Sequence, residues 1–146
     1  MVEDIIITVM DGEEYLKNAL EIGLDREWAK KSANFDGRMR MQGIYIFHIS
    51  APRRIIYVGK TRGPTMDFRT RLYRHATKSA SQSNPKVYET LKKITKETQR
   101  SVLVSLLTTE QIRNLFKGKP LEDAALVDIY EQVLIHLLKP DMQQEE

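Results

Sequence analysis

The most restrictive feature of this sequence is a pair of apolar runs in its middle, residues 43–50 and 54–58, joined by a short turn that contains Pro52. Both runs are rich in β-branched and aromatic residues, which favour strands, and the short connection predicts an antiparallel hairpin. A third run of the same kind covers residues 101–107. We therefore expect a sheet with three core strands.

The remaining segments mostly have the apolar spacing of helices. Helices are predicted over residues 13–32, 66–78, 86–98, 109–117 and 121–138, and a short β-branched strand over residues 3–9. With 146 residues, the length favours one domain. The expected fold is a small α/β (α+β) domain whose mixed or antiparallel three-stranded sheet is flanked by helices, and residues 3–9 could widen this sheet.

Charge is distributed unevenly along the chain, although its sum is only +3. Residues 38–100 contain fifteen Lys and Arg against three Asp and Glu, a net charge of +12, whereas residues 1–37 carry −5 and residues 101–146 carry −4. A basic middle of this kind is typical of a surface that binds nucleic acid. The alternative is that these basic residues lie on solvated helix faces and neutralise the acidic ends across the fold.

Composition excludes several classes of protein. Without cysteine, the chain has no disulfide, no Cys-ligated zinc and no cysteine nucleophile. Its 41% of apolar residues is too high for a disordered chain, and its apolar stretches are too short to span a bilayer. The first residues lack the layout of a signal peptide. We therefore expect an intracellular, cytoplasmic protein with no membrane partner.

Several polar residues occupy positions that the apolar pattern does not explain. Tyr45 lies on the first strand of the hairpin and Tyr57 on the second. Arg71 and His75 are four residues apart, so they share one face of their predicted helix. Glu131 lies among apolar residues of the last helix, where a carboxylate is costly unless it meets a cation or a metal.

Together with the neighbouring glycines, these residues resemble the signature of the GIY-YIG nucleases. Residues 43–45 read Gly-Ile-Tyr, and after eleven further residues 57–59 read Tyr-Val-Gly. Members of the family carry an arginine downstream, followed by leucine and, four residues after the arginine, by Tyr or His, as at residues 71–75 here. Their glutamate lies in a helix that ends before a proline, as Glu131 and Pro140 do in this sequence.

The resemblance implies a divalent-metal-dependent endonuclease that hydrolyses phosphodiester bonds of DNA. It implies Tyr45 as the general base, Tyr57 as the group that orients water or phosphate, and Arg71 as the clamp on the scissile phosphate. It further implies His75 as a proton relay or phosphate donor, and Glu131 as the ligand of one Mg²⁺ or Mn²⁺. A guanidinium fits two phosphate oxygens, and one carboxylate suits Mg²⁺, which keeps several waters.

Each of these residues also has a purely structural interpretation. The two tyrosines could simply pack their rings, Arg71 could be a surface arginine, and His75 an ordinary helix histidine. Glu131 could form a buried ion pair with an arginine. Further contacts to substrate are expected from Lys60, Arg69, Arg74 and Gln143, of which Gln143 stands where the family often has asparagine and has a side chain longer by one methylene.

The resemblance covers residues 42–143, which we expect to be the nuclease domain. Residues 1–41 are expected to be an extension, a strand plus a helix packed on the core, and residues 144–146 a loose tail. Restriction, homing, repair and mobile-element nucleases use this domain, and the short extension fits a stand-alone restriction or phage-type enzyme best. Double-strand cleavage would need two sites, hence a homodimer. The alternative functions are a nucleic-acid-binding module that keeps the scaffold but does not cut, and a structural domain.

Overall fold

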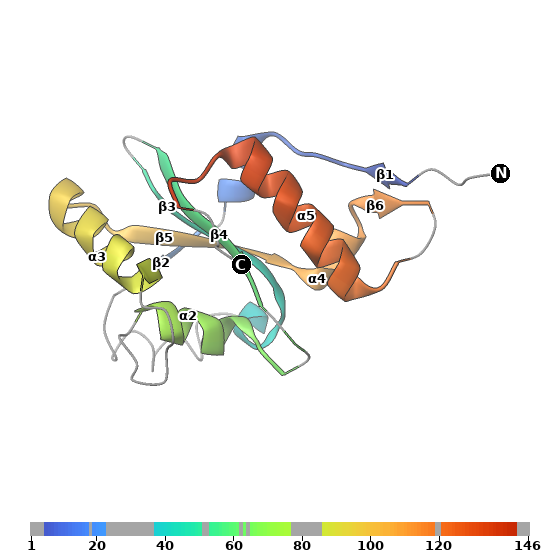
Figure 1. Cartoon of the computed structure of the whole chain (residues 1–146), viewed down its shortest axis with the longest axis horizontal. Coiled ribbons are helices and arrows are strands. Elements are labelled where there is room, and N and C mark those ends of the chain that lie inside the picture. Colours follow the sequence, from blue (N-terminus) through green and yellow to red (C-terminus); the bar gives the residue numbers. More distant parts are fainter. Residues whose placement is uncertain are drawn as a thin grey trace.

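The computed structural model describes residues 5–17, 19–22, 37–50, 53–61, 63, 65–76, 86–118 and 121–142. These residues form antiparallel sheets with helices packed on them (Figure 1). The predicted α+β class is therefore confirmed. Within the same residues, no helix is both long enough and apolar enough to cross a membrane.

The main sheet has four strands rather than the predicted three. In spatial order they are β2 (Leu20–Ile22), β5 (Val102–Thr108), β3 (Gly43–Ile49) and β4 (Arg54–Lys60), all antiparallel to their neighbours. The three core strands and the β3–β4 hairpin occur where the sequence predicts them. Their register places Tyr45 opposite Gly59 and Phe47 opposite Tyr57, so the two tripeptides lie side by side.

The additional strand comes from a segment that the sequence predicts to be helical. Where the structure describes residues 13–32, that prediction is wrong: Gly12–Leu16 is a 3₁₀ helix (η1), and Leu20–Ile22 is β2. Leu20 and Ile22 lie opposite Val104 and Val102 of β5. Pairing with this strand edge outweighs the helical spacing, because propensity is weaker than packing against a partner strand.

Residues 3–9 do not widen the main sheet. Their strand β1 (Ile6–Ile7) pairs with β6 (Phe116–Lys117) in a separate two-stranded sheet. The same pairing shortens the helix predicted over 109–117, because α4 (Thr109–Arg113) has to end before the chain enters β6.

Helices cover the main sheet on both faces (Figure 1). The remaining helical elements are η3 (Gly37–Arg40), α2 (Phe68–Ala76), α3 (Lys86–Thr98) and α5 (Asp123–Leu138). Phe68 and Leu72 of α2, with Leu91 and Ile94 of α3, form one core with the sheet face that carries Tyr45. The opposite face, with Ile44 and Val58, packs against α4 and α5 in a second core.

Strand β4 lies at the edge of the sheet, and the chain after α5 returns to it. The turn after α5 contains Lys139 in the left-handed conformation, followed by Pro140, which confirms the predicted helix stop. The amides of Asp141 and Met142 then donate to the carbonyls of Ile55 and Ile56, at 3.0 and 2.9 Å. The chain after α5 therefore runs along the edge strand β4.

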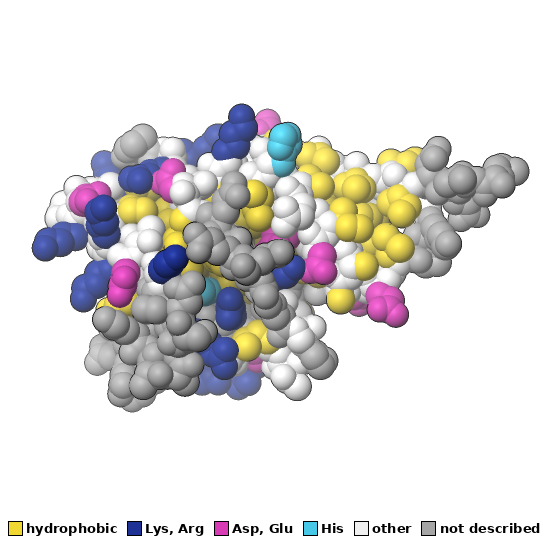
Figure 2. All heavy atoms as spheres, in the orientation of Figure 1, with side chains coloured by type: hydrophobic (Ala, Val, Ile, Leu, Met, Phe, Trp, Pro, Cys, Tyr) yellow, Lys and Arg dark blue, Asp and Glu magenta, His cyan; other side chains and the backbone are white. Residues whose placement is uncertain are grey.

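The basic middle of the chain has two kinds of environment. Ion pairs join it to the acidic ends, as between Lys60 and Asp128 and between Arg54 and Asp141. Other basic residues are exposed and concentrated on α3, namely Lys86, Lys92, Lys93 and Lys96. Figure 2 shows Lys and Arg side chains gathered at the end of the molecule where α3 lies. Part of the basic segment therefore neutralises the acidic ends, and the expected nucleic-acid surface stays a prediction.

Candidate functional site

Two glycines permit the close packing of the paired tripeptides. A Cβ at Gly59 would overlap the hydroxyl end of the Tyr45 side chain, which lies directly against this glycine. Gly43 has φ of 152°, and a Cβ there would run into the carbonyl oxygen of Leu107 on the neighbouring strand. Glycine is needed at both positions because a backbone or a ring approaches too closely for any side chain.

The Tyr45 hydroxyl is the centre of a buried polar cluster. It lies 2.8 Å from His75 Nε2 and accepts a hydrogen bond from Arg71 Nε at 3.1 Å. Because the guanidinium can only donate, the tyrosine proton is available to His75 Nε2, which then acts as the acceptor. In this arrangement Nδ1 of His75 carries the imidazole proton, and this buried atom has no hydrogen-bond partner in the part of the chain described.

Tyr57 completes this cluster from β4. Its ring centroid is 6.1 Å from that of Tyr45 and 5.9 Å from that of His75, and its ring stacks on Phe47. A side-chain hydrogen bond also links it to Arg71. Four predicted site residues, Tyr45, Tyr57, Arg71 and His75, are thus brought into contact from a hairpin and one helix.

Burial sets the protonation states in the cluster. Desolvation raises the pKa of Tyr45 well above its ordinary value, and Tyr57 adds to this, whereas the charge of Arg71 acts in the opposite direction without prevailing. Desolvation likewise lowers the pKa of His75 to about 3, helped by the positive charges of Arg71 and Arg74. At neutral pH both Tyr45 and His75 are therefore uncharged.

The neutral state of His75 predicts a loss of stability on acidification. In the unfolded chain its pKa returns to about 6.5, so between this value and about 3 the unfolded state binds more protons and the free energy of unfolding rises with pH. His48, buried against Ser105, has its pKa lowered by burial to about 4 and acts in the same direction. Well inside this window, each histidine contributes up to about 1.4 kcal/mol per pH unit. Urea unfolding at several pH values between about 4.5 and 7.5 measures this slope.

The variant His75→Gln isolates the contribution of His75 to the slope of the free energy of unfolding against pH. His75→Gln should flatten the dependence of stability on pH by the contribution of His75, and the contribution of His48 should remain. If acidification lowers the free energy of unfolding of the wild type and of His75→Gln by the same amount, His75 carries its proton in the folded state.

Glu131 approaches the cluster from the other face of the sheet. Its side chain is buried, and Lys60 Nζ lies 3.4 Å from its Oε1. Its charge contributes to the raised pKa of Tyr45, as the smallest of the causes named for that shift. A cation does meet this buried carboxylate, as expected, although the one found here is a lysine.

Asp128 is a neighbouring residue that the sequence analysis missed. It accepts a hydrogen bond from Lys60 Nζ, so that one ammonium touches carboxylates of both Asp128 and Glu131. The two acidic residues are three apart on α5 and therefore lie on one side of it. This spacing was visible in the sequence, but nothing there indicated that Lys60 would lie opposite.

The donor set suits only certain metals. Among the residues that the structure describes, no three His, Asp or Glu side chains gather as potential metal ligands. Glu131 offers one buried carboxylate that already attracts a cation. A hard cation that keeps several waters, such as Mg²⁺ or Mn²⁺, fits this arrangement.

The other expected substrate contacts are placed less clearly. Arg74 lies near enough to His75 to lower its pKa, and Arg69 has a buried Nε without a hydrogen-bond partner in the described residues. Gln143 lies outside the described residues, so its prediction stays open.

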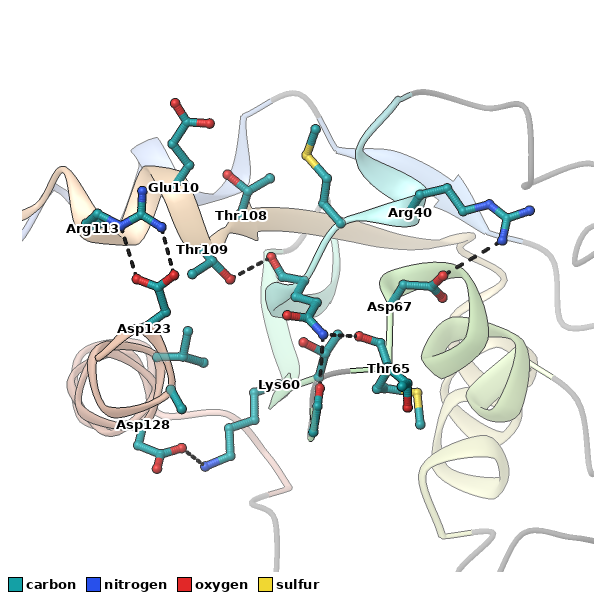
Figure 3. A pocket seen from close by; sticks show the side chains of 17 residues that line it. Arg40, Lys60, Thr65, Asp67, Thr108, Thr109, Glu110, Arg113, Asp123 and Asp128 are labelled. Carbon is teal, nitrogen blue, oxygen red and sulfur yellow. Dashed lines mark hydrogen bonds and ion pairs between the residues drawn. The ribbon is translucent and has the colours of Figure 1, made fainter. Parts of the chain in front are cut away.

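A hollow of about 960 Å³ opens beside Lys60 and Asp128 (Figure 3). Its lining comes from the end of η3 and the two residues before β3, the ends of β4 and β5, the loop before α2, and helices α4 and α5. Lys60 and Asp128 line it, whereas Tyr45, His75 and Glu131 do not. Basic residues on its wall are paired with acids, as Arg113 is with Asp123 at 2.8 Å. We place the candidate site at the buried cluster and not in the hollow.

Comparison of the chain with protein-family models, with curated proteins and with solved structures finds no match. The resemblance to GIY-YIG nucleases therefore rests on the residues named above and on no overall similarity.

Proposed function

We propose that this protein is a divalent-metal-dependent DNA endonuclease that hydrolyses phosphodiester bonds. The observation that carries the proposal is the Tyr45 hydroxyl, buried between His75 Nε2 and Arg71 Nε. Burying polar and charged groups together costs free energy, and apolar side chains at the same positions would not incur this cost. Such a constellation is expected at a site of proton transfer and phosphate binding, and it gives no advantage to a structural domain.

In the proposed reaction, Arg71 leaves the Tyr45 hydroxyl and takes the scissile phosphate, which its planar fork can bind through two oxygens. This movement opens the hydroxyl to water. As the water oxygen bonds to phosphorus, its proton passes to the Tyr45 oxygen and the tyrosine proton passes to Nε2 of His75. The bond from phosphorus to the leaving sugar oxygen breaks, and that oxygen takes a proton from solvent. Tyr45 stays neutral in this step, whereas His75 becomes an imidazolium; the negative charge of the phosphate bound at Arg71 stabilises it, and it returns its proton to solvent after cleavage.

Glu131 is the residue proposed to hold the divalent ion, which, when bound, would supply positive charge to the phosphate in the transition state. Tyr57 orients water or phosphate through its contacts with Arg71 and the Tyr45 ring. Exposed lysines of α3 and Arg69 and Arg74 of α2 are proposed to contact the DNA backbone. Contacts of this kind contribute affinity without sequence preference.

Cleavage of supercoiled plasmid tests this function. With Mg²⁺ the wild-type protein should convert plasmid to nicked or linear product, and EDTA should stop the conversion. Glu131→Gln, which keeps the shape of the side chain but removes its charge, should lose activity at the same protein concentration. Gln132→Glu, on an exposed neighbouring position of α5, is a matched control that changes charge without touching the site, and it should cut normally.

The products distinguish the remaining alternatives. Linear product formed directly from supercoiled plasmid would favour a homodimer, whereas nicked product alone would favour a single site. A wild-type protein that shifts DNA in a gel, but leaves plasmids and oligonucleotides of varied sequence uncut in Mg²⁺ or Mn²⁺, would contradict the endonuclease. It would support the non-cutting binding module instead.

A further inference from the structure

We propose that the outward face of α5 binds a second copy of this chain, with the two helices packed antiparallel about a twofold axis through Ile129. This face consists of Glu122, Ala125, Ile129, Val133 and His136. None of these residues belongs to the polar cluster around Tyr45, so the association does not depend on the proposed activity.

Helix α5 is apolar on the side that faces solvent as well as on the side that faces the sheet. Leu126 and Leu134 are buried in the core. On the solvent side Ile129 is 36% exposed, with Ala125 and Val133 half-buried one helical turn away on either side. In Figure 1, α5 runs across the front of the molecule, and no described helix or strand lies over it. A helix that is apolar on all sides is normally covered on all sides, so a partner is expected here.

The N-terminal segment adds to this apolar surface. The Tyr130 hydroxyl donates a hydrogen bond to the carbonyl of Thr8 at 2.7 Å, which holds the segment next to α5. Ile6 and Val9 of the same segment are 59% and 49% exposed. Figure 2 shows apolar side chains gathered over α5 and the β1–β6 sheet. Apolar residues that gather in this way mark an interaction surface, whereas single exposed apolar residues do not.

The order of residues along the outward face is symmetric about Ile129. Ala125 and Val133 lie four residues before and after it, and Glu122 and His136 lie seven residues before and after it. In an antiparallel pair Ile129 therefore meets its own copy, and Ala125 meets Val133 of the second copy. A twofold interface requires such self-complementary contacts, and the small side chain of Ala125 allows the two helices to approach closely.

Charge is complementary in the same arrangement. Glu122 stands at the N-terminal end of α5, and its side chain makes no capping hydrogen bond. His136 lies in the last turn, and the exposed Lys139 follows it. An antiparallel pair places Glu122 of each copy beside His136 of the other, whereas a parallel pair would place the two Glu122 carboxylates together. Since like charges in contact are unfavourable, charge favours the antiparallel pair.

Sedimentation velocity over a range of protein concentrations tests this association. The wild type should form a dimer whose population grows with concentration. Ile129→Glu places two carboxylates at the twofold axis and should raise the Kd of the dimer by about 100-fold. Tyr73→Glu is the matched control, because Tyr73 is 38% exposed on α2, which packs against the opposite face of the sheet. The Kd of this control should equal that of the wild type.

An exchange of charges tests the antiparallel arrangement. Glu122→Lys brings positive side chains together and His136→Glu brings negative ones together, so each should raise the Kd about tenfold, because the pair occurs twice in a dimer. The double variant should recover the Kd of the wild type. Within one chain the two residues are about 21 Å apart along the helix, so only a second copy can produce this recovery. Far-ultraviolet circular dichroism should show the same helix content in all variants.

The outcomes separate this association from the proposed endonuclease. A dimer that Ile129→Glu weakens, and that the charge exchange weakens and then restores, supports the proposal. A wild type that sediments as a monomer at about 100 µM, well above a micromolar Kd, would overturn it, and plasmid nicking by that monomer would leave the endonuclease standing. A dimer that Ile129→Glu leaves intact would lie on another surface and would also overturn it. A double variant as weak as the single ones would overturn the antiparallel arrangement.

Discussion

Tyr45→Phe should lower the rate of DNA cleavage by about 10³-fold, within the range of about 10²–10⁴ that general acid–base catalysis contributes. The substitution removes one oxygen atom and leaves the ring in its packing against Phe47 and His75. What is lost is the atom proposed to receive the proton from water and to pass it to His75 Nε2. Single-turnover cleavage of a labelled duplex, at saturating protein, measures the chemical step without the contribution of DNA binding.

Two tyrosine variants serve as controls for this loss. Tyr73→Phe removes a hydroxyl from an exposed position on α2 and should cut as the wild type does. Tyr57→Phe should cost less than Tyr45→Phe, because Tyr57 is proposed to orient and not to accept the proton. A larger loss in Tyr57→Phe would exchange the roles of the two tyrosines. Nearly full activity in Tyr45→Phe would rule out the proposed base.

Gly59→Ala should abolish most activity through geometry alone. The backbone of Gly59 is not in the left-handed region, so alanine brings no backbone strain there. Its methyl group would nevertheless overlap the Tyr45 hydroxyl, which is enclosed by His75 and Arg71 and cannot move freely. A displacement of about 1 Å at a reacting group costs about 10²-fold in rate, and overpacking costs about 1–3 kcal/mol of the free energy of unfolding.

Gly37→Ala is the matched control, because a Cβ at Gly37 meets no atom within 4 Å. It should change the free energy of unfolding by less than about 0.5 kcal/mol and leave cleavage unchanged. Plasmid nicking and urea unfolding of both variants give the comparison. Gly59→Ala with wild-type activity would mean that the hydroxyl of Tyr45 does not need its observed position.

The elements that the sequence predicts well are those whose signal is local. The β3–β4 hairpin and α3 follow from alternation and helical spacing within a few residues. The strand at Leu20–Ile22 does not, because its partner β5 lies about eighty residues further along the chain and only the folded sheet brings them together. Local spacing there is compatible with a helix, and long-range pairing decides against it.

The same distinction applies to the site. Tyr45, Tyr57, Arg71 and His75 were identified through short motifs, and the structure does bring them together. Their protonation states were not predictable, because burial, which the sequence does not show, outweighs the charge of Arg71 at Tyr45. Asp128 was missed for a related reason: its partner Lys60 comes from β4, and only three-dimensional contact reveals the pair.

The hairpin divides its own sequence between two faces, and this has a consequence for how such a chain can diverge. Tyr45 and Tyr57 lie on the face that carries the polar cluster, whereas Ile44 and Val58 belong to the core under α5. Exchange of one β-branched residue for another at Ile44 or Val58 alters packing volume in the core under α5, on the face opposite Tyr45. Substitutions can therefore accumulate at the half of the strand positions that face α5. They lower the overall sequence similarity while the geometry of the site is retained.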